Sequence, residues 1–211
     1  MNKRALIVSF PRSGTHFLMN TLSMNLGYVN KHVNLEPLGF NFWVGQNVHW
    51  VLERAFKHSP PNTFVKSHHE IWFFEDVMER IFPMYDVFYI SRNTKDVMNS
   101  YCRHINALPW LEGPKVKSGE ELANSRPIGG MLRYQYQQHP MVGHKHIAHV
   151  SEWQNSNHKD KIIYVRYEDL NENFEETVDN IAQQIGRKAK RIIRPSRTES
   201  VVKDGEVFTT Q

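Results

Sequence analysis

Near its start the chain reads RALIVSFPRSGTHF (residues 4–17), and this stretch decides the fold. The apolar run that ends at Phe10 is of the kind found in strands buried on both faces of a parallel sheet. Residues 11–15 interrupt the run, and the apolar spacing from Phe17 to Leu26 then predicts a helix that Gly27 ends. A buried strand, a short loop and a helix therefore follow one another directly.

The loop between that strand and that helix has the composition of a phosphate cradle. Backbone N–H groups of the turn and of the first helical turn point at one spot, and the helix dipole favours an anion there. Gly14 lets the backbone approach a ligand closely, Arg12 offers paired donors with a fixed charge, and Ser13 and Thr15 add hydroxyl groups. The alternative is an ordinary helix with Ser13 as its cap. The G-x-x-x-x-G-K-[ST] signature of ATP- and GTP-hydrolysing enzymes is absent, which disfavours a kinase.

Strands and helices alternate along the rest of the chain. We expect strands at 63–66, 85–91 and 161–166, helices at 71–82, 94–105, 128–154 and 172–185, and a long loop at 107–127. This order predicts an α/β fold with an open, mostly parallel sheet flanked by helices on both faces. Ligands of such sheets bind beyond the carboxyl ends of the strands.

Length and composition limit the class of protein. The 211 residues fit one domain, residues 1–211, and the 40% of apolar and 23% of charged residues exclude a disordered chain. The net charge of +4 suits an anionic ligand but decides little. The single cysteine, Cys102, cannot form an intrachain disulfide and gives no sign of an oxidising compartment. No segment has the length of a signal peptide or membrane span, so we expect a cytoplasmic protein.

A second motif, YISRNTKDVMNSY (residues 89–101), also runs from a strand into a helix. Arg92 lies at the strand end, and Ser100 lies eight residues later, about two helical turns on. Both side chains can therefore approach one anion. The alternative makes Arg92 and Asn93 a turn, followed by a solvated helix start at Lys95 and Asp96.

Together these motifs resemble those of sulfotransferases that use 3′-phosphoadenosine 5′-phosphosulfate (PAPS). Residues 11–17 resemble the family's 5′-phosphosulfate loop, P-[KR]-S-G-T-x-[WF], and residues 89–101 resemble its 3′-phosphate motif at every defining position. The stretches Val65–His68, His149–Trp153 and Tyr164–Leu170 also agree with family motifs. The resemblance covers roughly residues 6–186 and implies the P-loop-like sulfotransferase fold of the P-loop-containing nucleotide hydrolase type.

The resemblance implies an enzyme that moves a sulfuryl group from PAPS to a hydroxyl or amine acceptor and releases 3′-phosphoadenosine 5′-phosphate (PAP). It makes His68 the general base, with His69 and Glu70 as rivals, and gives Lys66 and Arg12 the task of stabilising the leaving group. No metal is required. The residues that it assigns to the nucleotide are Arg12, Ser13, Gly14, Thr15, His16, Phe17, Arg92, Ser100 and Tyr167.

Two other functions remain open: a PAPS- or nucleotide-binding module without transferase activity, and a nucleotide kinase of related fold. His144, His146 and His149 suggest a metal site, but no carboxylate or cysteine completes the set at a useful spacing. We expect a small-molecule or glycan acceptor and no nucleic acid, and the oligomeric state stays open, with a homodimer as one option. The acceptor pocket is expected in residues 30–62 and 107–127, with the aromatic residues Phe40, Phe42, Trp43, Trp50 and Trp110.

The tail, residues 187–211, departs from the family pattern. The family usually carries a C-terminal R-K-G-x-x-G-D-W loop that grips the 3′-phosphate, and this sequence lacks it. The tail is instead rich in basic residues: Arg187, Lys188, Lys190, Arg191, Arg194 and Arg197. We expect Arg194, Arg197 or Lys203 to fold over the nucleotide, with the tail mobile until then. The alternative is a tail that stays solvated.

Overall fold

A parallel sheet forms the centre of the molecule. The computed structural model describes residues 3–29, 32–34, 60–134, 137–189, 191–196, 199–203 and 206–210, and for 32–34, 134 and 199–210 it describes the backbone alone. Within these ranges the five strands of the sheet are β1 (Arg4–Ser9), β2 (His32–Asn34), β3 (Phe64–Ser67), β4 (Tyr85–Ser91) and β5 (Ile163–Arg166). Their order is β2-β3-β1-β4-β5, and all neighbours are parallel. The strands that follow β1 in sequence lie on both of its sides, β2 and β3 on one and β4 and β5 on the other. The carboxyl end of β1 therefore lies at the switch point where such sheets bind ligands.

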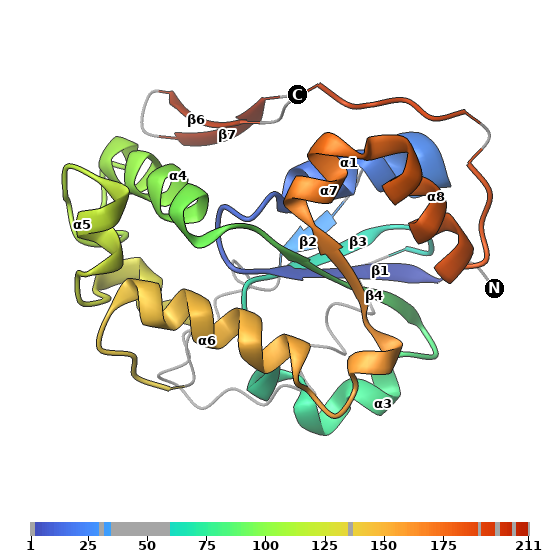
Figure 1. Ribbon diagram of the computed structural model, residues 1–211, viewed down its shortest axis with the longest axis horizontal. Helices are drawn as coiled ribbons and strands as arrows, with labels where there is room; N and C mark the ends of the chain where they lie inside the picture. The colour runs from blue at the N-terminus through green and yellow to red at the C-terminus, as the bar shows by residue number, and fades with distance from the viewer. Residues whose placement is uncertain are drawn as a thin grey trace.

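Helices cover both faces of this sheet (Figure 1). α1 (Thr15–Leu26), α7 (Tyr167–Glu172) and α8 (Phe174–Gln184) lie on one face, and α3 (Met78–Ile81) and α6 (Val142–Gln154) lie on the other. Along β1, Ala5 and Ile7 pack into the first core, whereas Leu6 and Val8 pack into the second. All four are at most 2% exposed, which explains why the run is apolar without alternation. The predicted α/β fold is confirmed.

A third cluster fixes the second motif beside the sheet. It joins α4 (Thr94–Ala107), α5 (Gly119–Ala123) and α6 through Phe10, Val97, Leu122 and other buried residues. Asn93 caps α4, because its side-chain oxygen accepts a hydrogen bond from the Lys95 N–H at 2.9 Å. The start of α4 is thereby held where β4 ends.

Four predicted segments differ from the structure. The helix expected at 71–82 is two 3₁₀ turns, Ile71–Phe73 and Glu75–Val77, followed by α3. The buried residues Ile71, Phe74 and Val77 recur every three positions, which is the 3₁₀ period. The expected loop at 107–127 contains α5, which Ser118 caps by accepting from the Glu121 N–H. The helix expected at 172–185 corresponds to α8 at Phe174–Gln184, and α7 at Tyr167–Glu172, which was not expected, precedes it.

The long helix expected at 128–154 was also wrong. A 3₁₀ helix at Gly129–Tyr134 precedes α6, which begins only at Val142. Pro140 has no N–H group and disfavours helical backbone at the residue before it, so it separates the two segments. Among the described residues, no helix combines the length and the apolar character that crossing a bilayer requires.

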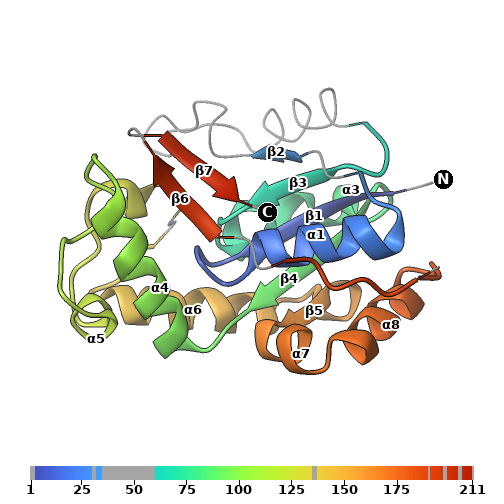
Figure 2. The same cartoon turned by 90° about the horizontal axis from the view of Figure 1, so that it is seen from above.

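The tail begins as a segment packed along α1. The Ile193 N–H donates to Asn25 Oδ1 at 2.6 Å, and Asn25 Nδ2 donates to the Ile193 carbonyl at 2.9 Å. The backbone of this part is therefore anchored to α1, whereas the side chains of Lys188, Arg191 and Arg194 are exposed. Beyond it, β6 (Glu199–Lys203) and β7 (Glu206–Thr210) form an antiparallel hairpin over the carboxyl edge of the sheet, near α4 (Figures 1 and 2). Lys190 and Arg197 lie outside the described residues.

Candidate active site

The two predicted phosphate motifs meet at the carboxyl edge of the sheet. β1 and β4 are hydrogen-bonded neighbours whose register pairs Ser9 with Ile90, so both motifs start at the same level. Arg12 Nε donates to Ser100 Oγ at 3.2 Å, across 88 residues of sequence. Ser100, which is expected to share an anion with Arg92, also contacts the cation of the first motif. One basic surface thus combines both motifs.

Two residues of the first loop have a positive φ angle. Arg12 has a φ of 72°, a left-handed conformation that costs a non-glycine residue ~1–2 kcal/mol. Gly14 has a φ of 102° and forms the cap of α1. A Cβ at Gly14 would lie 2.5 Å from Cδ2 of Tyr167, so this position requires glycine for space as well as for conformation. The Tyr167 ring stands directly over the loop.

Aromatic rings and a second arginine surround Tyr167. Its ring centroid lies 5.9 Å from that of Phe17 and 4.2 Å from the Arg92 guanidinium carbon. Arg92 Nε and Ser13 Oγ are buried and have no hydrogen-bond partner within the described part of the chain. A buried donor without a partner costs ~1–3 kcal/mol, and each of these two belongs to a loop predicted to hold a phosphate. The rings of Phe17 and Tyr167 and the donors of the two loops together fit a ligand with one flat ring and two anionic groups.

His68, the predicted base, directly follows β3. Its Nδ1 lies 2.8 Å from the carbonyl oxygen of Ser9, which can only accept, so Nδ1 carries the proton and Nε2 carries the lone pair. Burial and the nearby Lys66 ammonium lower the pKa of His68 well below its usual 6.5. The imidazole is therefore neutral near pH 7 and can accept a proton at Nε2.

The two rival bases have packing partners. His69 places Nδ1 2.8 Å from Ser67 Oγ and stacks on Phe73 at 4.1 Å between ring centroids. It is 1% exposed, and burial lowers its pKa to about 3. Glu70 is also 1% exposed, and its Oε1 accepts from His139 Nε2 at 3.3 Å. These contacts favour structural roles for both.

Two polar residues beside the proposed site were not identified from the sequence. Ser9 lies within the first motif, as the last residue of an apolar strand. His104 lies one helical turn after Ser100, on the same side of α4. Burial and the positive charges of Arg12 and Lys66 lower the pKa of His104 to about 4, so this imidazole is near both cations. The four-residue spacing between Ser100 and His104, which places both on one side of a helix, could have indicated this residue from the sequence.

The three histidines considered for a metal have separate surroundings on α6. His146 Nδ1 lies 3.2 Å from Thr94 Oγ1, and His149 Nδ1 lies 2.8 Å from the Tyr89 hydroxyl. His144 is exposed. The described ranges contain no group of three potential metal ligands.

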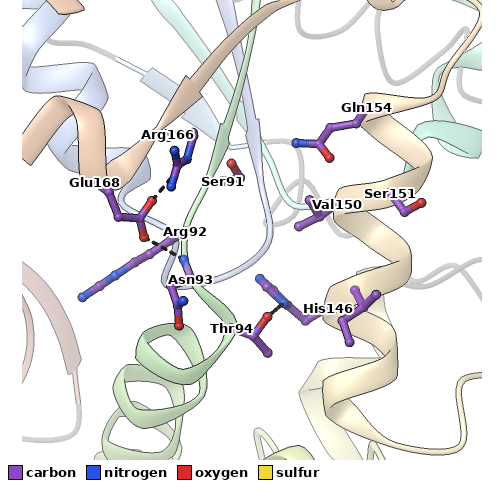
Figure 3. A pocket seen from close by; sticks show the side chains of 11 residues that line it. Ser91, Arg92, Asn93, Thr94, His146, Val150, Ser151, Gln154, Arg166 and Glu168 are labelled. Atoms are coloured by element: carbon purple, nitrogen blue, oxygen red, sulfur yellow. Dashed lines mark hydrogen bonds and ion pairs between the residues drawn. The ribbon is translucent and has the colours of Figure 1, made fainter.

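A cavity of about 460 Å³ lies beside the second motif, between α6 and the ends of β4 and β5 (Figure 3). Ser91, Thr94, His146 and Gln154 are among its lining residues. The Arg92 side chain points away from α6, so its guanidinium does not face the space between the motif and the helix (Figure 3). Arg92 is nevertheless among the residues that line the cavity, while its guanidinium carbon lies 4.2 Å from the Tyr167 ring centroid.

Comparisons with known proteins agree with this geometry. The family model "Sulfotransferase domain" matches residues 2–207. A mouse sulfotransferase complexed with PAP has a TM-score of 0.62 and 17% identity, over 90% of this chain and 61% of that one. Retinol dehydratase in a complex with retinol and PAP has a TM-score of 0.58 and 18% identity, over 90% of this chain and 61% of that one.

A sulfotransferase from Alicyclobacillus acidocaldarius has a TM-score of 0.54 and 14% identity, over 91% of this chain and 84% of that one. No curated protein matches the sequence. The chain spans about three-fifths of the length of the first two relatives, and at these identities the structural likeness shows the fold alone. Because the family model covers residues 2–207, nearly the whole sequence, the chain belongs to the sulfotransferase domain family.

Proposed function

We propose that the chain is a PAPS-dependent sulfotransferase that acts on a hydroxyl or amine acceptor. The observation that carries the proposal is the 3.2 Å hydrogen bond from Arg12 to Ser100, which joins the two phosphate motifs. His68 lies at the end of the strand next to β1, with its lone pair on Nε2. Two fold relatives were crystallised with PAP, which supports the same class of nucleotide here.

The proposed nucleotide site divides into three parts. The 5′-phosphosulfate is assigned to Arg12, Ser13, Gly14, Thr15 and His16, where helix α1 begins. The adenine is assigned to the rings of Phe17 and Tyr167. The 3′-phosphate is assigned to Arg92 and Ser100. The buried donors Ser13 Oγ and Arg92 Nε would then gain partners.

The residues of this site have distinct chemical tasks. When bound, PAPS supplies a sulfuryl group on a phosphate leaving group. His68 Nε2 takes the proton of the acceptor's hydroxyl or amine, while the Ser9 carbonyl holds the proton on Nδ1. Arg12 and Lys66 neutralise the charge that develops on the leaving phosphate.

We expect PAP to bind at least about tenfold more tightly than AMP, because the loss of a charge-assisted contact costs ~1.5–3 kcal/mol. Titration calorimetry with both nucleotides measures this difference. Arg92→Ala should reduce it, whereas Lys95→Ala, which removes an exposed cation of the same motif, should leave it intact. Equal affinities for PAP and AMP in the unmodified chain would contradict the 3′-phosphate assignment.

The tail gives a further prediction, since Arg194, whose Nη2 donates to Asn171, lies near the ring of Phe17. Its guanidinium carbon lies 6.0 Å from the Phe17 ring centroid and 5.6 Å from that of Phe174. Truncation after Ile193 should therefore weaken PAP binding by roughly three- to tenfold and reduce its salt dependence, because a cation is lost. Arg194→Ala should reproduce part of the effect, with Arg191→Ala, another exposed arginine, as its control. Unchanged affinity in the truncated chain would rule out that the tail folds over the nucleotide.

A further inference from the structure

A chain of hydroxyl groups connects the phosphate loop to His68. Ser9 Oγ lies 2.7 Å from Thr15 Oγ1 and 3.3 Å from His68 Nδ1. Ser9 is fully buried and Thr15 is 5% exposed, so water competes little for these contacts. The three residues come from the end of β1, the start of α1 and the end of β3. Ser9 is thus the link between the loop and the base.

The chemistry of these groups allows one consistent direction of donation. The Nδ1 proton of His68 is directed at Ser9, with the carbonyl oxygen at 2.8 Å and the hydroxyl oxygen at 3.3 Å. If Ser9 Oγ accepts from Nδ1, its own proton is available for Thr15 Oγ1. The Thr15 proton is then available for an anion in the phosphate loop. An anion there favours this direction over the reverse, because it can only accept.

We propose that Ser9 is a positioning residue that couples the occupation of the phosphate loop to the strength of His68 as a base. The inference rests on the proposed function, in which the loop holds the phosphosulfate. An anion at Thr15 orients the Ser9 hydroxyl so that its lone pairs face His68 Nδ1. When Nε2 takes the acceptor's proton, the resulting imidazolium donates more strongly from Nδ1 to Ser9. No proton passes along the chain, since the acceptor's proton stays on Nε2.

This coupling matters because the surroundings of His68 oppose its protonation. Burial disfavours a positive charge on the ring, and so do Lys66 on β3, His149 on α6 and His16 on α1. The Ser9 carbonyl acts in the opposite direction and raises the pKa of His68. A base that is too weak accepts a proton poorly. A contact from Ser9 that depends on the bound nucleotide would strengthen His68 as a base when PAPS is bound.

The test uses the full chain and measures the pKa of His68 by imidazole ¹⁵N NMR, with and without PAP. In the unmodified protein PAP should raise the pKa by about one unit, partly through direct attraction and partly through Ser9. Ser9→Ala should lose about half of the shift or more, and Ser9→Thr, which retains the hydroxyl, should recover it. Ser67→Ala is the matched control, because Ser67 is an equally buried serine at the end of β3 whose hydroxyl contacts His69.

Kinetics give a second readout. Ser9→Ala should lower kcat about tenfold while the Kd for PAP changes less than about threefold. The variant loses a contact that favours the charged imidazole, so the pKa falls and the acidic limb of the kcat profile should move to lower pH. A merely structural role would lower the rate without moving that limb. Thr15→Val, which removes the far end of the hydroxyl chain, should shift the limb in the same direction even if Ser9→Ala folds poorly.

A full PAP-induced shift in Ser9→Ala, or an equal loss of the shift in Ser67→Ala, would overturn the coupling. The two proposals fail separately. If the unmodified chain binds PAP but transfers no sulfuryl group, the proposed function fails, yet the NMR shift still reports on Ser9. If the chain turns over but the shift ignores Ser9, the coupling alone fails.

Discussion

His68→Ala should lower turnover at least about 100-fold, because general-base catalysis contributes ~10²–10⁴-fold. The affinity for PAP should change little, since the base acts on the acceptor and Nε2 is not among the groups assigned to the nucleotide. Steady-state rates at saturating PAPS, together with PAP titrations, measure both quantities. Thermal unfolding of the variant shows whether the loss of the hydrogen bond to the Ser9 carbonyl has disturbed the fold.

Glu70→Gln is the matched control for this experiment. Glutamine has nearly the same shape as glutamate and can still accept from His139, the partner of Glu70 at 3.3 Å. The variant should therefore retain most of the activity. Near-normal rates in His68→Ala combined with a large loss in Glu70→Gln would show that Glu70, and not His68, is the base.

Arg12→Ala should lower kcat by ~10²–10³-fold, the usual cost of removing one donor that stabilises charge in the transition state. Arg12 is the cation of the first motif, it has a left-handed backbone, and its side chain contacts Ser100. Arg12→Lys should restore only part of the rate, because an ammonium group cannot reproduce the paired donors of guanidinium. Single-turnover measurements at saturating PAPS separate this effect from weaker binding.

Arg103→Ala provides the comparison for Arg12. Arg103 is an exposed arginine of α4, three residues after Ser100, and its loss changes the net charge by the same amount. It should affect kcat by less than about twofold. A comparable loss in both variants would mean that Arg12 acts through the overall field of the protein and not through contact with the reacting groups.

Much of the fold could be predicted because local signals and packing agree. The run from Ala5 to Val8 is buried on both faces, and Gly27 ends α1 in a left-handed conformation, as the sequence indicated. The prediction failed at 71–82, where apolar residues recur with a spacing that suits both an α-helix and successive 3₁₀ turns. Packing of Ile71, Phe74 and Val77 against the sheet decides between them, and that depends on residues far away in the sequence.

The fold brings residues of the two predicted motifs together, but the sequence did not predict how they pair. The motifs identified Arg12, Ser100 and Tyr167, but the hydrogen bond between Arg12 and Ser100 depends on how β1 and β4 lie in register. The contact from Ser9 to His68 likewise joins residues 59 positions apart in sequence, at the ends of β1 and β3. A motif shows which chemical groups are present, whereas their partners depend on the fold.

The local sequence gives the least information about which acceptor the protein binds. Phe40, Phe42, Trp43 and Trp50 lie outside the described residues. Trp110 is 43% exposed, and its Nε1 donates to Glu112 Oε2 at 3.2 Å. Its indole face is thus available to a ligand while its polar end is fixed. The acceptor loops have no shared motif, so their chemistry must be found by experiment.

The most direct test of the account is transfer from PAPS labelled with ³⁵S to a panel of phenols, sterols, sugars and peptides. We expect at least one acceptor to become labelled, PAP to be released in equal amount, and the product to disappear with His68→Ala. A chain that binds PAP tightly but labels no acceptor in the panel, or that consumes magnesium-ATP instead, would contradict it.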